Sequence, residues 1–257
     1  MSQYYSGKRT RNFYLNNGKE FRLSRSKIEN FLHCPRCFYI DRKLGVDQPP
    51  GYPFSLNSAV DTLLKKEFDI YRNEKTPHPL FKEYNIDAVP FVHEKMDEWR
   101  ETFKGLQYHD EASGFLVTGA IDDIWQNSKG ELHVVDYKAT SKNGEVSLDA
   151  DWQKSYKNQM EMYQWLLRHQ PDGFKVSSIG YFVYVNGRTD LESFDEKLEF
   201  DVKIIPYEGD DSWVGQALLD AKKCLDSDSL PPATKECDYC LYRKSVQNVL
   251  APFIEKR

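Results

Sequence analysis

The sequence predicts a mixed α/β fold in which a central β-sheet is flanked by helices. Residues 119–138 contain two apolar runs separated by a turn-forming cluster at 126–130, which is the pattern of a β-hairpin. Residues 152–169 carry apolar and aromatic side chains at helical spacing. Residues 176–185 and 198–205 alternate as strands do. Strands and amphipathic helices in one chain favour the mixed class.

The remaining elements follow from the same spacing rules. A helix is expected after Ser24, which is a fair N-cap, with Ile28 on its apolar side. A break at Pro49 and Pro50 precedes an amphipathic helix over 57–71. Further expectations are an arm or edge strand over 1–22, a loop over 74–91, a short helix over 92–103 and a last helix from Trp213.

The chain has the size and composition of a globular protein. With 257 residues, 40% of them hydrophobic and 29% charged, it can bury a full core, and we expect one domain over residues 1–257. Its apolar runs are too short to cross a bilayer, and no charged start followed by an apolar segment indicates a secretory signal. We therefore expect a cytoplasmic protein without membrane contact.

The second run of the predicted hairpin, residues 133–138, contains an acid and an amine. Because side chains alternate across a strand, Asp136 and Lys138 share one face and lie roughly 6–7 Å apart along the backbone. Asp122 lies in the other run, shortly after Gly119. Charges within strands are costly to desolvate unless they are paired or bind a metal. Two carboxylates and a lysine at one sheet edge therefore predict a site for a hard divalent cation.

The spacing Asp-x-Lys alone is not specific, because it occurs five times in the chain. The setting of Asp136 and Lys138 distinguishes them, since a Gly-x-x-Asp run precedes them and a helix with Gln159 and Tyr163 follows. These two helical residues are four positions apart, so they project together. Gly-x-x-Asp, Asp-Tyr-Lys and Gln-x-x-x-Tyr, in this order, resemble the PD-(D/E)xK nuclease superfamily, and are most similar to its RecB-like branch.

The RecB-like branch includes the CRISPR-associated iron–sulfur adaptation nucleases and the nuclease domains of AddAB-type helicase–nucleases. The resemblance implies a restriction-endonuclease-like core with a mixed central sheet. It also implies an Mg²⁺- or Mn²⁺-dependent deoxyribonuclease, an exonuclease on single strands or DNA ends, in repair, recombination, or CRISPR and phage DNA processing. Besides DNA, it suggests helicase, CRISPR or recombination proteins as partners.

The resemblance also implies roles for the residues of the hairpin. Asp122 and Asp136 correspond to acids that bind the catalytic metal, and the backbone carbonyl of Tyr137 is expected to be a further ligand. Lys138 corresponds to the lysine that orients the attacking water or stabilises developing charge. It can serve as a base only if its pKa is several units below the ordinary value.

Two helices are expected to contribute further residues. In the family, the residues matching Gln159 and Tyr163 lie beside the site and hold the nucleic-acid backbone; the alternative for Tyr163 is core packing. Asp61 falls where the family usually has a metal-binding histidine. Aspartate is a competent ligand of hard cations, so this role can persist with a different metal preference. The alternatives are that Asp61 is a surface residue, or that Glu67 contributes.

The net charge of −5 means that the chain is no general binder of polyanions, so a DNA contact needs a local basic surface. Taken singly, each basic cluster is better explained as solvated surface. The candidate clusters are Lys8, Arg9 and Arg11; Lys65 and Lys66; Lys138 and Lys142; and Lys154 and Lys157.

Five cysteines in a chain of this kind indicate metal binding rather than disulfides. Four of them form two Cys-x-x-Cys pairs, which is a strong signal for a metal site. The pairs are Cys34 with Cys37, and Cys237 with Cys240. We expect residues 24–48 and 224–245 to form a cysteine-clamped lobe that joins the two ends of the chain. Cys224 is expected to be a small core residue.

The related iron–sulfur nucleases use one N-terminal and three C-terminal cysteines. In this chain the fourth of those positions is occupied by Val246, and Cys37 can supply the missing thiolate. Paired Cys-x-x-Cys motifs suit structural zinc, and four cysteines equally suit a 4Fe–4S cluster, which the resemblance favours. Either metal is expected to be structural, because four thiolates leave no open ligand position.

Two other functions fit parts of the pattern. One is a nucleic-acid-binding relic of the nuclease fold, which the departure at Asp61 favours, although relics usually lose an acid or the lysine. The other is a structural metalloprotein that acts as an adaptor. An adaptor leaves the acids of the predicted strand unexplained.

Overall fold

The computed structural model describes residues 13–15, 17–49, 51 and 54–254, so the basic cluster at 8–11 lies outside the described residues. The chain forms two compact units. We call them the cysteine unit (Met1–Tyr52, His109–Val117 and Trp213–Arg257) and the sheet unit (Pro53–Tyr108 and Thr118–Ser212). Both segments of the expected cysteine lobe belong to the cysteine unit.

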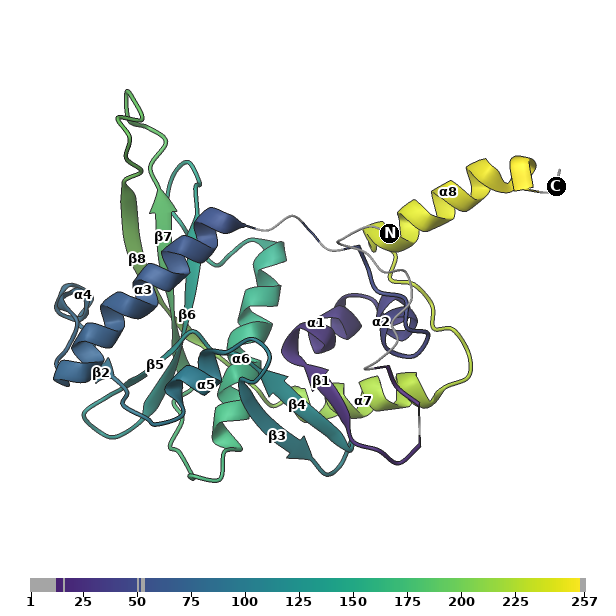
Figure 1. Ribbon diagram of the computed structural model, residues 1–257, viewed down its shortest axis with the longest axis horizontal. Coiled ribbons are helices and arrows are strands. Elements are labelled where there is room, and N and C mark those ends of the chain that lie inside the picture. The colour runs from purple at the N-terminus through teal and green to yellow at the C-terminus, as the bar shows by residue number, and fades with distance from the viewer. Residues whose placement is uncertain (1–12, 16, 50, 52–53, 255–257) are drawn as a thin grey trace. The chain divides into compact units, whose positions relative to one another are not determined.

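The sheet unit is built on a five-stranded mixed sheet with the strand order β2-β5-β6-β7-β8 (Figure 1). β6 runs parallel to β7, and the other neighbours are antiparallel. A parallel pair needs a long crossover connection, and α6 (Lys154–Arg168) lies between these two strands in the sequence. The strands are β2 (Val89–Pro90), β5 (Asp123–Gln126), β6 (Leu132–Thr140), β7 (Ile179–Gly187) and β8 (Phe200–Glu208).

The hairpin predicted over 119–138 is the antiparallel pair β5–β6, in which Asp123 pairs with Val135. The side chain of Asn127 accepts two backbone N–H groups of the turn, which explains why this polar cluster reverses the chain. The first apolar run is divided, however. Its beginning belongs to β4 (Phe115–Gly119), a strand of a second sheet.

Two helices, α3 (Ser55–Glu74) and α6, flank the five-stranded sheet (Figure 1). Phe68 of α3 packs in the same core as Tyr137 of β6, with 5.7 Å between the ring centroids. Side chains alternate along β6, so Asp136 and Lys138 point to the opposite face, where both contact α6. The alternation therefore separates the polar pair from the aromatic core.

Short elements in the sheet unit differ from the prediction. The loop expected over 74–91 contains β2 and the helix α4 (Pro79–Glu83), which forms because His78 accepts a backbone N–H of its first turn. The helix expected over 92–103 is reduced to α5 (Met96–Arg100). The long helix begins with a 3₁₀ turn, Asp151–Gln153, before α6.

The cysteine unit is mainly helical. Its helices are α1 (Arg25–His33), α2 (Pro35–Arg42), α7 (Val214–Asp226) and α8 (Asp238–Ile254). β1 (Phe21–Ser24) lies in a three-stranded sheet of order β1-β4-β3, and the sequence boundary between the units falls within β3 (Leu106–Asp110) and β4.

The helices of the cysteine unit match the expectation in part. α1 begins after Ser24 as predicted and buries Ile28, although the Ser24 hydroxyl contacts Ser26 Oγ at 3.0 Å instead of capping a backbone N–H. α7 begins next to Trp213 as predicted, whereas α8 is an additional helix. Among the described residues, no helix is both long and apolar enough to cross a membrane.

Candidate active site

Asp136 and Lys138 form an ion pair on the face of β6 that α6 covers. The side chain of Asp136 is fully buried, and that of Lys138 is 14% exposed. Burial alone lowers the pKa of Lys138, but the carboxylates of Asp136 and Asp122 raise it by more, so its pKa lies above the ordinary value. Lys138 is therefore an ammonium group in this arrangement.

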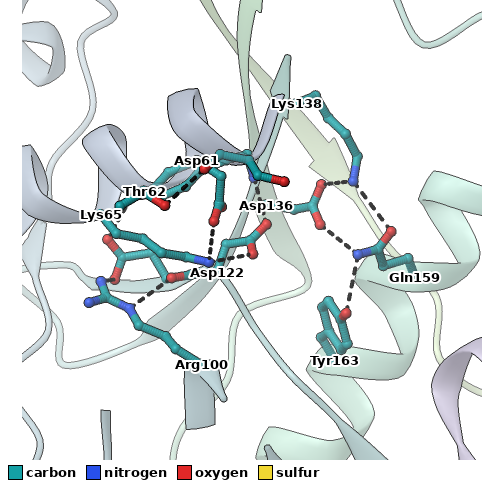
Figure 2. Close-up of polar contacts among 12 residues, drawn as sticks. Asp61, Thr62, Lys65, Arg100, Asp122, Asp136, Lys138, Gln159 and Tyr163 are labelled. Atoms are coloured by element: carbon teal, nitrogen blue, oxygen red, sulfur yellow. Dashed lines mark hydrogen bonds and ion pairs between the residues drawn. The ribbon is translucent and has the colours of Figure 1, made fainter. Parts of the chain in front are cut away.

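Gln159 of α6 connects this acid and this amine (Figure 2). Its Nε2 donates to Asp136 Oδ1 at 2.8 Å, and its Oε1 accepts from Lys138 Nζ at 3.3 Å. One helical turn later, the hydroxyl oxygen of Tyr163 accepts from the same Nε2 at 3.1 Å. An amide carries both a donor and an acceptor, so it can hold a carboxylate and an ammonium at once.

The ring of Tyr163 lies directly against Gly119, the glycine of the Gly-x-x-Asp run. A Cβ at Gly119 would lie 2.9 Å from Cε1 of Tyr163 and 2.9 Å from Cδ1 of Leu166, closer than side chains pack. The glycine is therefore needed because α6 approaches the backbone here, which gives this motif position a physical reason.

Asp122 reaches the site from the bend that precedes β5, and not from within a strand as predicted. Regular pairing of β5 with β6 stops at Asp123. Beyond that point, Oδ2 of Asp122 accepts the backbone N–H of Tyr137 at 2.9 Å. The carboxylate thus takes the place of a strand carbonyl and is held beside the Asp-Tyr-Lys run.

Asp61 of α3 faces Asp122 across the ammonium of Lys65 (Figure 2). Lys65 Nζ lies 2.9 Å from Asp61 Oδ2 and 3.2 Å from Asp122 Oδ1. Burial and the charge of Asp122 raise the pKa of Asp61. Asp61 and Asp122 therefore face the same ammonium group. Glu67 does not share this site, because its Oε1 lies 3.0 Å from Nε2 of His78.

These side chains line an open cavity of about 450 Å³ in the sheet unit. Its polar lining includes Asp61, Lys65, Asp122, Lys138 and Tyr163. Within the described part of the chain, only the cysteines bring three or more potential metal ligands within 4.8 Å of one another. The acids therefore do not form a closed metal cage in this arrangement, in which lysine ammonium groups are bound to them.

A buried charge network behind Asp122 was missed by the sequence analysis. Asp123 has no exposed side-chain surface and pairs with Arg72 and Arg100, while it accepts the hydroxyl of Tyr137 at 2.8 Å. Arg100 Nε also donates to the backbone carbonyl of Asp122 at 2.9 Å. The network thus fixes the peptide that carries Asp122. The sequence carried one signal of this network, which is Asp123 itself, because a charged side chain in an apolar strand needs a partner.

The two cysteine pairs come together in the cysteine unit, at the starts of α2 and α8. The Sγ–Sγ separations are 3.8 Å for Cys34–Cys240, 3.5 Å for Cys37–Cys237 and 3.6 Å for Cys37–Cys240. All four sulfur atoms lie within 4.8 Å of one another, so this group can hold a metal ion. Cys224 is outside the group, and burial raises its pKa to about 11.

The surroundings of the sulfur atoms affect the pKa of the clustered thiols differently. Burial raises the pKa of Cys34, but backbone hydrogen bonds from Thr234 and Cys37 and the neighbouring thiols lower it by more, to about 6. Burial and the neighbouring thiols raise the pKa of Cys37, and burial raises the pKa of Cys237. Arg243 Nη2 donates to Cys240 Sγ at 3.1 Å and to Cys37 Sγ at 3.4 Å. Thiolate is the form that binds metal, so these contacts suit a four-cysteine metal site.

Comparison with protein families agrees with this geometry. Residues 22–245 match the PD-(D/E)XK nuclease superfamily. The chain belongs to this superfamily. The matched range includes the acids and lysine of the sheet unit as well as all four clustered cysteines. The predicted fold class is thereby confirmed.

Members of the PD-(D/E)XK superfamily are typically nucleases that need a divalent metal, so membership supports metal-dependent nuclease activity. No curated protein is similar enough to this member of the superfamily to count as a match. A solved structure described as "Crystal structure of SSO0001" is 15% identical, with 88% of this chain and 85% of that chain covered and a TM-score of 0.41.

Proposed function

We propose that this PD-(D/E)XK protein is an Mg²⁺- or Mn²⁺-dependent deoxyribonuclease of the RecB-like branch. The observation that carries the proposal is that Asp122 and Lys138 line one open cavity, while Lys138 is also paired with the buried Asp136. We further propose exonuclease action on single strands or DNA ends, in repair, recombination, or CRISPR and phage DNA processing. Helicase or recombination proteins are the proposed partners.

The acids fit a hard divalent cation by their chemistry. Carboxylate oxygens are the ligands that Mg²⁺ prefers. The ammonium of Lys65 lies between Asp61 and Asp122, so the space between these carboxylates attracts positive charge. We propose that Asp61, Asp122, Asp136 and the backbone carbonyl of Tyr137 hold the ion. When bound, it acts as a Lewis acid toward a phosphoryl oxygen and makes water a stronger nucleophile.

Lys138 contributes a positive charge, because its ammonium is paired with Asp136 and held by Gln159. The ammonium can donate to a phosphoryl oxygen and stabilise the negative charge that develops during phosphodiester hydrolysis. Gln159 holds this ammonium beside Asp136. Tyr163 and Gln159 then position the DNA backbone from α6.

The direct test is cleavage of labelled single- and double-stranded DNA with Mn²⁺, with Lys138→Met and Asp136→Asn beside the wild type. Lys129→Met and Asp149→Asn are matched controls, because both residues are exposed. We expect the wild type and controls to cleave and both site variants to lose at least about hundredfold in rate. Full activity of Lys138→Met overturns the role of the lysine, and products from end-blocked DNA separate exonuclease from endonuclease action.

A nucleic-acid-binding relic is the second candidate, because Asp61 replaces the usual histidine and Lys65 lies on the acids. A relic binds DNA in fluorescence anisotropy but cleaves none with any divalent metal. A structural adaptor neither binds nor cleaves DNA. Binding and cleavage measured on the same samples therefore separate the three functions.

For the cysteine group we propose one tetrahedral ion, with zinc as the metal. Thiolates about 2.3 Å from zinc in a tetrahedron have sulfur atoms about 3.8 Å apart. The Sγ–Sγ separations of 3.5, 3.6 and 3.8 Å are close to this value. In a 4Fe–4S cluster the cysteines bind different irons, which holds their sulfur atoms farther apart.

Elemental analysis and the visible absorption spectrum of anaerobically purified protein test the metal. We expect about one zinc per chain and a colourless solution. About four irons per chain with a brown colour would establish a 4Fe–4S cluster instead.

A further inference from the structure

Lys65 occupies an unusual position for a helical lysine. Its ammonium lies between two carboxylates, 2.9 Å from Asp61 Oδ2 and 3.2 Å from Asp122 Oδ1 (Figure 2). Asp61 is one turn away on α3, whereas Asp122 comes from the bend before β5. Only 22% of the Lys65 side chain is exposed, and its ammonium contacts a carboxylate oxygen of each acid.

The three groups depend on one another electrostatically. The carboxylates of Asp61 and Asp122 both lie within 3.2 Å of one ammonium, so these two like charges are close together and repel each other. A cation between them removes this repulsion. A surface pair at i and i+4 contributes little by itself, but a half-buried ammonium shared by two acids is bound more strongly.

We propose that Lys65 is a tethered cation that competes with the divalent metal for Asp61 and Asp122 and thereby sets the metal affinity of the site. This inference rests on the proposed function, because it assumes that these acids bind a divalent ion. The ion and the ammonium seek the same carboxylate oxygens, so one must leave when the other binds. Lys65 then makes metal binding weaker than the acids alone allow.

The competition is distinct from the role of Lys138. Lys138 is paired with Asp136 and held by Gln159 on the α6 face of the sheet. Lys65 approaches from α3. None of the hydrogen bonds and ion pairs that the structure describes for Lys65 involves Asp136, Lys138 or Gln159. Removing the Lys65 charge therefore alters the charge balance at Asp61 and Asp122 and leaves the Asp136–Lys138 ion pair in place.

Calorimetric titration with Mn²⁺ in the absence of DNA tests the proposal independently of cleavage. The proteins are the wild type, Lys65→Gln, Lys65→Met and Lys65→Arg, together with Asp122→Asn to assign the heat to this site. Lys66→Gln is the matched control, because Lys66 is the next residue on α3 and is exposed. It removes the same charge from the same helix without touching the acids.

We expect both neutral variants of Lys65 to bind Mn²⁺ about tenfold more tightly than the wild type, a factor typical of hydrogen bonds to charged groups. Lys65→Arg keeps the cation and is expected to bind no more tightly than the wild type. Lys66→Gln is expected to change the dissociation constant less than about twofold, because exposed charges are screened.

An unchanged or weaker Mn²⁺ affinity in both neutral variants overturns the competition. If Asp122→Asn abolishes binding in that case, the metal site and the proposed nuclease function stand and only this inference fails. If neither the wild type nor the neutral variants bind Mn²⁺, the proposed metal ligands fail together with it. Mn²⁺ binding that appears only in the neutral variants supports the proposal and means that Lys65 excludes the ion from the wild-type site.

Discussion

The side-chain carboxylate of Asp122 accepts the backbone N–H of Tyr137, with 2.9 Å between Oδ2 and N. This hydrogen bond ties the bend before β5 to the middle of the Asp-Tyr-Lys run. It also turns the second oxygen, Oδ1, toward Lys65. One carboxylate thus completes the edge of the strand pair and contributes charge to the cavity.

Replacement of Asp122 separates these two functions. Asp122→Asn keeps a carbonyl oxygen for the Tyr137 N–H but removes the charge, whereas Asp122→Ala removes both. We expect both variants to lose cleavage, and only the alanine variant to lose about 1–3 kcal/mol of unfolding free energy, because a buried donor is left unpaired. Urea unfolding measures the difference; equal stability of the two variants contradicts the structural role of the hydrogen bond.

Gln159 is expected to act by positioning Lys138 and Asp136. Gln159→Leu fills a similar volume but can neither donate to Asp136 nor accept from Lys138. Partners of this kind commonly contribute about 10–100-fold in activity, and we expect a loss of cleavage rate in that range. Gln216→Leu, at an exposed position of α7, is the control. An unchanged cleavage rate in Gln159→Leu excludes this role.

Gly119 is expected to tolerate no side chain. A methyl group at this position meets Tyr163 and Leu166 at 2.9 Å, so Gly119→Ala must displace the ring beside Gln159. Overpacking of this size commonly costs about 1–3 kcal/mol, and we expect lower stability together with slower cleavage. Gly215→Ala, where the added atom meets nothing within 4 Å, is the control. Identical melting of the wild type and Gly119→Ala refutes the steric argument.

Metal removal is expected to act through the cysteine unit. A strong chelator, or Cys237→Ser, leaves thiolates without their ion, and the melting temperature is expected to fall by several degrees. Zinc added back restores the wild type but not the variant. Cys224→Ser provides the matched control, because Cys224 is outside the cysteine group. Equal melting with and without chelator indicates that the cysteines hold no structural metal.

The stability of the cysteine unit is expected to depend on Asp41 at acidic pH. Its fully buried carboxylate pairs with Lys27 and Arg42, each at 2.7 Å. Burial raises the pKa of Asp41, but these cations lower it by more, so its folded-state pKa lies below the ordinary value. A lowered pKa contributes stability that is fully present above about pH 4 and is lost as the pH falls through the folded-state value.

Thermal melting of Asp41→Asn between neutral and acidic pH measures this contribution. We expect the variant to melt below the wild type at neutral pH, and the two melting temperatures to converge as the pH falls below about 4. Asp149→Asn, at an exposed position, is expected to follow the wild type. A constant difference between Asp41→Asn and the wild type at every pH contradicts the assignment.

Much of the sheet unit could be predicted because its elements have strong local periodicity. Alternation identified β7 and β8, the hairpin pattern identified β6, and helical spacing identified α6 with Gln159 and Tyr163 on one side. Such patterns depend on neighbours along the chain. The short helix α4 was missed and α5 was predicted too long, because a five-residue element has too few residues to show a period.

The sequence by itself determined which residues could do chemistry: the Asp-Tyr-Lys run, the acid after a glycine, and two cysteine pairs. Only the tertiary structure decided which of them meet, since Lys65 contacts Asp122 and Asp123 contacts Arg72 across 57 and 51 positions of the chain. The physical reason is that periodicity is set by local backbone geometry, whereas burial of a charge is settled by whichever distant partner the packing brings beside it.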